Sequence, residues 1–213
     1  GGQTSGEVWM PKMKMKARLG DKNQEHCTVY NMMRLAEFLF RHTGDPGYAQ
    51  YREYNLYNGV MAQTYYREYA LNGNPHNHPG TGLLTYFLPM KAGLRKDWST
   101  ETSSFFCCHG TMVQANAAWN RGIYYQDRDD IYICQYFNSE MTTEINGGEL
   151  RIIQTQDPMN GNSMTSSNTA GYQSINEVAA IHENLPPYRK YDFVIRTSVQ
   201  QPFAIHFRIP EWI

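Results

Sequence analysis

The sequence has no excess of charge of either sign. Its 213 residues include 19 lysines and arginines against 20 aspartates and glutamates, which leaves a formal net charge of -1. Proteins that bind nucleic acid usually gather basic side chains on one face to neutralise phosphates. A composition this balanced excludes nucleic acid as an expected partner and fits a neutral, sugar-like ligand better.

Long apolar runs are missing as well. A membrane-spanning helix needs about 20 consecutive apolar residues, and the longest apolar stretches here are broken by a charged residue within a few positions. Residues 1–6 have neither the basic start nor the apolar stretch of a signal peptide. We therefore expect a soluble protein with no membrane partner. The compartment and the oligomeric state, including a homo-oligomer, stay open.

Cysteine is scarce, since only four occur in the chain. That density is too low for a small secreted domain held by disulfides, and Cys107 and Cys108 are neighbours, which favours metal binding or catalysis. Apolar and aromatic residues are plentiful, at 41% and 14%. They suffice for one sizeable or two modest cores, and aromatic rings also suit stacking on sugars.

The first half of the chain has helical periodicity. Apolar residues recur at helical spacing within residues 24–42, ahead of a stop at Gly44, and a similar segment follows the start signal at Pro46. These segments predict an αα-hairpin, and a third helix is expected over residues 110–121. Residues 72–82 are rich in glycine, proline and asparagine and predict a loop.

The second half is dominated by strand patterns. Beyond residue 127, β-branched and aromatic runs alternate with turn residues: IYICQYF, ELRIIQTQ, YDFVIRTS and FAIHFRIP. The expected class is α+β, with residues 1–126 helical and residues 127–213 forming an antiparallel β-sheet or β-sandwich. Residues 83–90 predict a short extended segment, and the polar residues 157–172 predict an exposed loop. Three helices make only part of an all-α domain, so we interpret the chain as a fragment of a longer one.

Adjacent cysteines give the first indication of chemistry. Neighbouring Cβ atoms point apart, so Cys107 and Cys108 cannot close an ordinary disulfide. We expect both thiols on an irregular segment ahead of a helix, whose N–H groups favour thiolates. Cys27 and the Glu25 carboxylate would complete a site of three thiolates and one carboxylate, a donor set suited to Zn²⁺. The alternative is that the cysteines are small buried apolar residues, which spacing alone does not exclude.

Five segments then follow one another along the chain. They are GEVW (6–9), EHCTVYNMMRLAEFLFRHTGD (25–45), LYNGVMA (56–62), TYFLPM (85–90) and SFFCCHGT (104–111). In kind and in order they resemble glycoside hydrolase family 127 and its near relative, family 146. These families are β-L-arabinofuranosidases with an (α/α)6 barrel followed by β-sandwich modules. The resemblance implies that residues 1–126 are the C-terminal part of such a barrel and residues 127–213 an incomplete β-sandwich domain.

The resemblance also implies roles for the metal-ligand candidates. The family's E-x-C motif falls on Glu25 and Cys27, which implies that both are zinc ligands. In the Cys-Cys pair, Cys107 is implied to be both the nucleophile and a zinc ligand. Cys108 is implied to be a structural zinc ligand.

Two further roles come from the same resemblance. Glu7 in GEVW is implied to be the general acid/base, and Tyr86 in TYFLPM to line the sugar pocket. With Zn²⁺ holding Cys107 as a thiolate, two displacements would release L-arabinofuranose from β-linked glycans with retained configuration. The competing hypothesis is a non-catalytic carbohydrate-binding or structural module held together by zinc. In that case Glu7 is an ordinary surface acid.

The chain departs from the family's pattern at some positions. His26 stands where a small residue is more usual, Leu88 where asparagine is frequent, and the loop over residues 63–79 is longer than expected. The family's pocket histidines come from earlier in the barrel and have no counterpart among the histidines of this chain. The HxH pair at His76 and His78 is interpreted as an exposed part of a loop. The particular glycan and its linkage therefore stay open.

Overall fold

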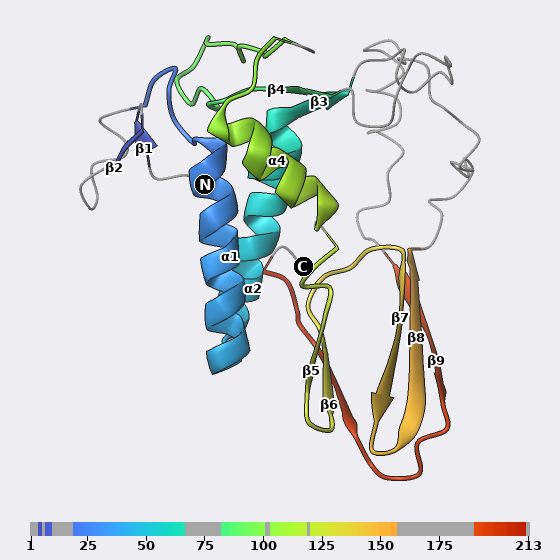
Figure 1. The fold of residues 1–213 in the computed structure, drawn as a ribbon. Helices are drawn as coiled ribbons and strands as arrows, with labels where there is room; N and C mark the ends of the chain where they lie inside the picture. Colours follow the sequence, from blue (N-terminus) through green and yellow to red (C-terminus); the bar gives the residue numbers. More distant parts are fainter. Residues whose placement is uncertain are drawn as a thin grey trace, which may run out of the picture. The chain divides into compact units, whose positions relative to one another are not determined.

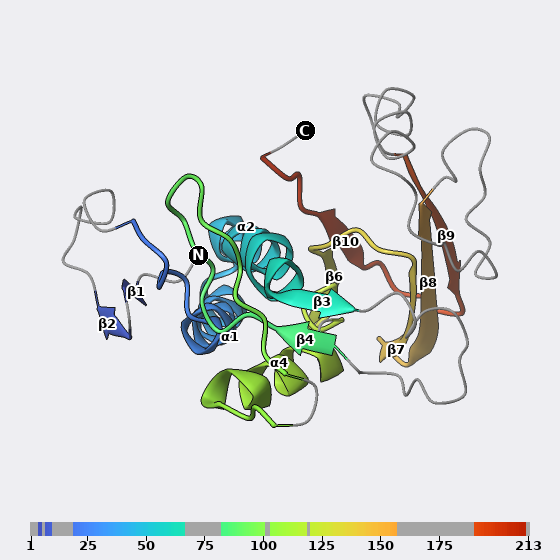
Figure 2. The same cartoon turned by 90° about the horizontal axis from the view of Figure 1, so that it is seen from above.

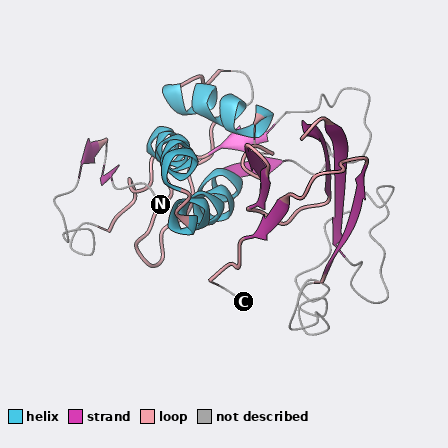
Figure 3. Ribbon diagram, turned by 90° about the horizontal axis from the view of Figure 1, so that it is seen from below, coloured by secondary structure: helices cyan, strands magenta, loops and turns pink. Residues whose placement is uncertain are grey.

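A computed structural model describes residues 4–5, 7–9, 19–66, 82–100, 103–118, 120–156 and 190–211. The chain divides into two compact units: Gly1–Arg121 with Pro210–Trp212, and Gly122–Ile209 with Ile213. Helices lie in the first unit, and the larger sheets are in the second (Figure 3). The class is thus a mixed α and β protein, as expected. Residues 72–81 of the loop predicted over residues 72–82 lie outside the described residues, and so does the loop predicted over residues 157–172.

The longest helix of the first unit, α1 (His26–Thr43), confirms the helix predicted for residues 24–42. Its buried face includes Val29 and Phe40, placed at helical spacing. The helix ends at Gly44, whose φ of 67° lies in the left-handed region and whose N–H donates to the Phe40 carbonyl. Glycine adopts this conformation without the strain that a Cβ would introduce, which explains the stop.

The second helix, α2 (Pro46–Asn55), starts where its signals predicted. The Asp45 carboxylate accepts a hydrogen bond from the Gly47 N–H at 2.8 Å and so caps the helix. The helical path continues through a π-helix, η2 (Leu56–Val60), and a 3₁₀ turn, η3 (Met61–Gln63). Helices α1 and α2 lie side by side, which confirms the αα-hairpin (Figures 1 and 2).

Glycine allows α1 and η2 to approach each other closely. A Cβ added at Gly59 would lie 2.4 Å from Cγ1 of Val29, which is far inside van der Waals contact. Val29 itself is fully buried. The absence of a side chain at Gly59 therefore sets the spacing between η2 and the start of α1.

The third helix differs from its prediction. Helix α4 (Cys107–Ala117) begins three residues earlier than expected, so both thiols lie in its first turn and not on an irregular segment ahead of it. The physical reason is a local closure of that turn. The Phe106 N–H donates to Nδ1 of His109 at 2.9 Å, and the His109 N–H donates back to the Phe106 carbonyl at 3.0 Å. The helix also ends earlier, at Ala117.

Two small antiparallel pairs complete the described part of the first unit. They are β1 (Thr4–Ser5) with β2 (Val8–Trp9), and β3 (Thr64–Tyr66) with β4 (Gly82–Leu84). Strand β4, extended by a bridge between Thr85 and Trp98, confirms the first three residues of the extended segment predicted over residues 83–90. This segment runs past the start of α1 and brings Tyr86 to the helix.

Within its described residues, the second unit has two three-stranded sheets, with strand orders β10-β6-β5 and β7-β8-β9. Their strands are β5 (Tyr124–Asp127), β6 (Asp130–Ile133), β7 (Ser139–Ile145), β8 (Gly148–Gln156), β9 (Tyr191–Thr197) and β10 (Ala204–Phe207). One pair corrects the antiparallel prediction, because β10 runs parallel to β6. The other sheet lies between them in the sequence, so a long connection returns the chain in the same direction.

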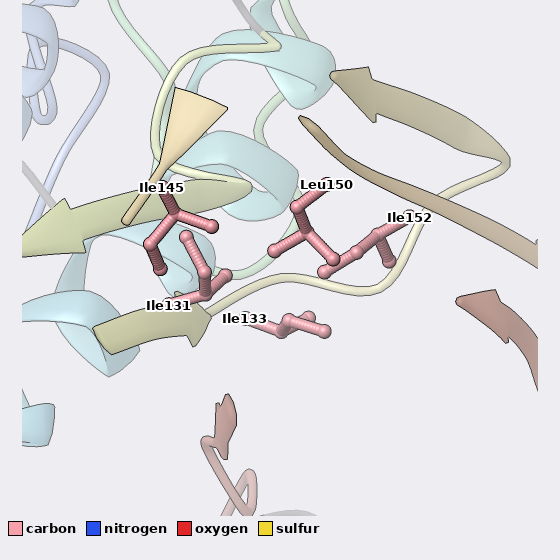
Figure 4. Packing of buried hydrophobic residues seen from close by; sticks show 5 residues of the cluster. All are labelled: Ile131, Ile133, Ile145, Leu150 and Ile152. Atoms are coloured by element: carbon pink, nitrogen blue, oxygen red, sulfur yellow. The ribbon is translucent and has the colours of Figure 1, made fainter. Parts of the chain in front are cut away.

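The core of the second unit draws on both sheets. Ile131 and Ile133 come from β6, and Ile145, Leu150 and Ile152 come from β7 and β8 (Figure 4). Leu150 and Ile152 alternate with more exposed neighbours, which is the period of a half-buried strand. Assignment of the two units to an (α/α)6 barrel and a β-sandwich remains a prediction. None of the helices in the described part of the chain has the length and apolar character that a bilayer crossing requires.

Candidate functional site

Four candidate ligands from distant parts of the first unit come together. Donor atoms of Glu25, Cys27, Cys107 and Cys108 all lie within 4.8 Å of one another. The sulfur of Cys108 is 3.5 Å from that of Cys27 and 4.0 Å from that of Cys107. The site therefore gathers three thiols and one carboxylate in one small volume.

This arrangement fits a metal ion. In a tetrahedral site with Zn–S bonds of about 2.3 Å, neighbouring sulfurs lie about 3.8 Å apart. The separations of the Cys108 sulfur from those of Cys27 and Cys107, 3.5 and 4.0 Å, lie on either side of that value. Soft thiolate donors favour zinc over hard cations such as Mg²⁺ or Ca²⁺. The cluster can thus bind a metal ion with little movement of its side chains.

Two helix starts position the ligands. Glu25 is the N-cap residue of α1 and Cys27 is the second residue of that helix, while Cys107 and Cys108 are the first two residues of α4. Helices α1 and α4 pack against each other, which brings the two starts together. An α-helix turns by about 100° per residue, so the neighbouring thiols face differently. Cys108 is fully buried and Cys107 is exposed.

A buried amide holds the segments that carry the site. Gln63 is fully buried, and its Nε2 lies 3.0 Å from the Gln24 carbonyl, 3.3 Å from that of Thr85 and 3.2 Å from that of Tyr86. The N–H of His26 also donates to the Tyr86 carbonyl, at 3.3 Å. The chain before α1 and the chain after β4 are therefore fixed to each other directly beside the ligands.

Tyr86 links the candidate acid/base to the candidate nucleophile. Its hydroxyl donates a hydrogen bond to the Glu7 carboxylate, and it lies 3.1 Å from Sγ of Cys107. Burial, together with its hydrogen bonds to Cys107 and Glu7, raises the pKa of Tyr86, so the phenol keeps its proton. Glu7, Tyr86 and Cys107 thus form a continuous polar row on the side of the cluster that is open to solvent.

Burial also affects the charges of the ligands. It raises the pKa of the Cys108 thiol and that of the Cys27 thiol. Burial, followed by the charge of Glu7, raises the pKa of Glu25. Several anions in one partly buried cluster repel one another, so a cation is needed to hold them in their ionised forms. The electrostatics of the cluster, like its geometry, therefore favour a bound metal ion.

Sequence reasoning missed two polar residues beside the cluster. The Thr111 hydroxyl lies 3.5 Å from Sγ of Cys27 and 2.9 Å from Nδ1 of His26. His26 is fully buried, and burial lowers the pKa of its imidazole to about 4, which keeps the ring neutral. His26 lies in the segment of residues 25–45 and Thr111 in that of residues 104–111, both of which resemble the family's motifs. Adjacency to a ligand was the available signal for His26, whereas the place of Thr111 depends on the packing of α4 against α1.

Other candidates lie elsewhere. Cys134 is buried in the second unit. His76 and His78 fall outside the described residues.

Comparison with known proteins identifies the family of this unit. Residues 1–121 match the family described as β-L-arabinofuranosidase, GH127 catalytic domain. No curated protein matches the chain.

Solved structures with similarity to the chain include a GH127 β-L-arabinofuranosidase from Geobacillus stearothermophilus T6, with 18% identity and a TM-score of 0.41, covering 63% of this chain and 21% of that one. A protein described as a glycoside hydrolase has 26% identity and a TM-score of 0.46, with 63% and 22% covered. A GH127 β-arabinofuranosidase has 17% identity and a TM-score of 0.49, with 73% and 22% covered. The chain spans about a fifth of the length of these structures. Because the family match covers more than half of the chain, including Glu25 and the three cysteines of the cluster, the chain belongs to glycoside hydrolase family 127 through its catalytic domain.

Proposed function

We propose that the protein is a retaining glycoside hydrolase that releases L-arabinofuranose from β-linked glycans. In this proposal Cys107 is the nucleophile and Glu7 is the general acid/base. Glu25, Cys27, Cys107 and Cys108 hold Zn²⁺. The observation that carries the proposal is that the Cys107 sulfur combines two properties. Cys107 belongs to the cluster of metal donors and lies 3.1 Å from the phenol that hydrogen-bonds Glu7.

The nucleophile needs to be a thiolate that can reach the sugar. Zn²⁺, when bound, supplies the positive charge that keeps the Cys107 sulfur ionised at neutral pH. Cys107 is exposed, so its sulfur can approach an anomeric carbon, whereas Cys108 is fully buried. Attack by the Cys107 sulfur forms a C–S bond at the anomeric carbon and breaks the bond to the departing oxygen.

Glu7 serves both halves of the reaction. In the first half its carboxyl group gives a proton to the departing oxygen. In the second half the resulting carboxylate takes a proton from a water molecule, which attacks the anomeric carbon and releases the Cys107 thiolate. Each displacement inverts the anomeric carbon, so the sugar leaves with its original configuration.

Tyr86 couples these two residues through one hydrogen atom. A phenol has a single O–H, so Tyr86 donates either to Glu7 or to Cys107 at any moment. While Glu7 is ionised, its carboxylate accepts the hydrogen of the Tyr86 hydroxyl. Once Glu7 is protonated, the Tyr86 hydrogen is free to stabilise the Cys107 thiolate, 3.1 Å away. That is the pair of protonation states with which the reaction begins.

The first experiment replaces the nucleophile in the intact protein. Cys107→Ser should abolish the hydrolysis of an aryl β-L-arabinofuranoside, because a serine hydroxyl is far less acidic and far less nucleophilic than a thiol. Cys134→Ala is the matched control, since Cys134 is a buried cysteine outside the cluster, and it should leave turnover intact. Undiminished turnover in Cys107→Ser would end the assignment of the nucleophile.

A second experiment isolates the covalent step and the role of Glu7. In Glu7→Gln, an aryl leaving group departs without help from an acid, while attack by water has lost its base. The sugar should therefore accumulate on Cys107 and be detected by mass spectrometry of the intact protein. Hydrolysis at the normal rate in Glu7→Gln would remove the acid/base role. Binding of zinc and arabinan with no hydrolysis of any arabinofuranoside would favour the non-catalytic module.

A further inference from the structure

The Thr111 hydroxyl occupies a junction between α1 and α4. Its oxygen lies 2.9 Å from Nδ1 of His26, 3.5 Å from Sγ of Cys27 and 3.2 Å from the Cys108 carbonyl. A threonine hydroxyl has one hydrogen to donate and two lone pairs that accept. The direction of each contact therefore depends on where the His26 ring carries its proton.

The burial of His26 decides between the two neutral tautomers. Its Nε2 is buried and has no hydrogen-bond partner among the described residues. A proton on Nε2 would leave a buried N–H without an acceptor, which native proteins avoid more strictly than an unpaired acceptor. A proton on Nδ1 instead points at Oγ1 of Thr111. The structure thus favours the Nδ1–H tautomer, with His26 as the donor and the Thr111 oxygen as the acceptor.

The Thr111 hydrogen then has two acceptors within reach. One is the neutral carbonyl of Cys108, and the other is the sulfur of Cys27. A charged acceptor forms the stronger hydrogen bond, so once Cys27 is a thiolate the hydrogen turns toward its sulfur. The contact at 3.5 Å is an ordinary length for a hydrogen bond to sulfur, whose radius exceeds that of oxygen.

We propose that His26 and Thr111 form a hydrogen-bond relay that positions Cys27 as a metal ligand, running from Nδ1–H of His26 to Oγ1 of Thr111 and from its O–H to the Cys27 sulfur. The proposal rests on the proposed function, because it assumes that the cluster holds Zn²⁺. His26 and Thr111 are positioning residues and touch neither metal nor substrate. The relay fixes the direction of the Cys27 sulfur and withdraws part of its negative charge. Outer partners of this kind change metal affinity by about 10–100-fold in other sites.

The test measures the metal itself in the intact protein. Zn²⁺ affinity is determined by competition with a chromophoric chelator, and the protein is also loaded with Co²⁺, whose thiolate-to-metal absorption reports the charge on the sulfurs. Thr111→Val, which removes the hydroxyl and keeps the shape, should weaken Zn²⁺ binding by about tenfold or more and shift the Co²⁺ absorption. Thr111→Ser restores the hydroxyl and should restore both.

A matched control separates the relay from the general effect of replacing a helical threonine by valine. Thr43 in α1 also donates its hydroxyl to a carbonyl of its own helix, that of Leu39 at 2.8 Å, and it lies at the far end of α1 from Cys27. Thr43→Val should leave both metal measurements at their wild-type values. An equal loss in Thr43→Val and Thr111→Val would overturn the relay.

The first half of the relay is tested at His26. His26→Asn keeps an N–H near the position of Nδ1, and His26→Leu removes it. His26→Asn should bind Zn²⁺ more tightly than His26→Leu, and this comparison stands even if Thr111→Val fails to fold. Wild-type affinity and an unchanged Co²⁺ spectrum in Thr111→Val, or equal affinities in the two His26 variants, would overturn the relay alone. A wild-type protein that binds no Zn²⁺ would overturn the proposed function and the relay with it.

Discussion

The close approach of η2 to α1 makes Gly59→Ala a stringent test of the helical packing. The new Cβ would lie 2.4 Å from Cγ1 of Val29, whereas carbon atoms in contact prefer about 3.5–4.0 Å. One of the two elements therefore has to move by about 1 Å or more. Val29 is fully buried, and a β-branched residue in a helix has one strongly preferred rotamer, so its methyl group cannot turn aside.

The expected cost follows from these contacts. Overpacking of this kind destabilises a protein by about 1–3 kcal/mol, and replacing a helical glycine by alanine returns up to about 1 kcal/mol. We expect a net loss of about 1–2 kcal/mol in the free energy of unfolding. It should be measured by urea denaturation followed by far-UV circular dichroism. Val29 follows Cys27 by two residues, so Zn²⁺ affinity should fall in the same variant.

Gly110 supplies the control. It lies inside α4, and a Cβ added there meets nothing within 4 Å. Gly110→Ala should therefore stabilise the chain by about 0.5–1 kcal/mol. In the double variant Gly59→Ala with Val29→Ala, the smaller side chain removes the clash, so the loss should be less than the sum of the two single losses. Equal stability of Gly59→Ala and Gly110→Ala would refute the reasoning.

Three other perturbations test separate features. Gln63→Leu removes the amide that faces three carbonyls. It should lower the free energy of unfolding by about 2–4 kcal/mol and weaken Zn²⁺ binding. An unchanged melting temperature and unchanged metal affinity would contradict the role of this amide. Leu150→Ala opens a cavity at a fully buried position in the core of the second unit, and a loss of about 2–5 kcal/mol is expected in thermal or urea unfolding. Treatment with a zinc chelator should increase the number of thiols that react rapidly with a disulfide reagent and abolish turnover until Zn²⁺ is returned, while buried Cys134 stays unreactive in the folded protein.

The sequence predicted features whose causes are local. Helix α1 followed from an apolar period and a glycine stop, and α2 followed from the Asp45-Pro46 signal, because each depends on residues within a few positions. The start of α4 at Cys107 could not be predicted from the sequence in the same way. Phe106 has no side chain that caps a helix, and the turn is closed by Nδ1 of His109, a less usual partner that no common start signal contains.

Features that depend on the packing of residues far apart in the sequence could not be predicted from the sequence. The parallel pairing of β10 with β6 joins strands separated by an entire sheet, and no local period records the direction of such a strand. The contact between His26 and Thr111 spans 85 positions of sequence. The resemblance to family motifs predicts the grouping of Glu25 with the cysteines, whereas spacing alone leaves a buried apolar role for the cysteines open.

The rotation between the first two residues of α4 has a consequence for chemical labelling. An electrophile arriving from solvent meets the sulfur of Cys107, while that of Cys108 is enclosed by protein. A sugar-shaped reagent with a reactive anomeric centre should therefore alkylate one cysteine of an adjacent pair and spare the other. Peptide mapping can read this selectivity directly. The helix in this way gives two chemically identical neighbours different reactivity, and a covalent probe for this protein can be designed around that difference.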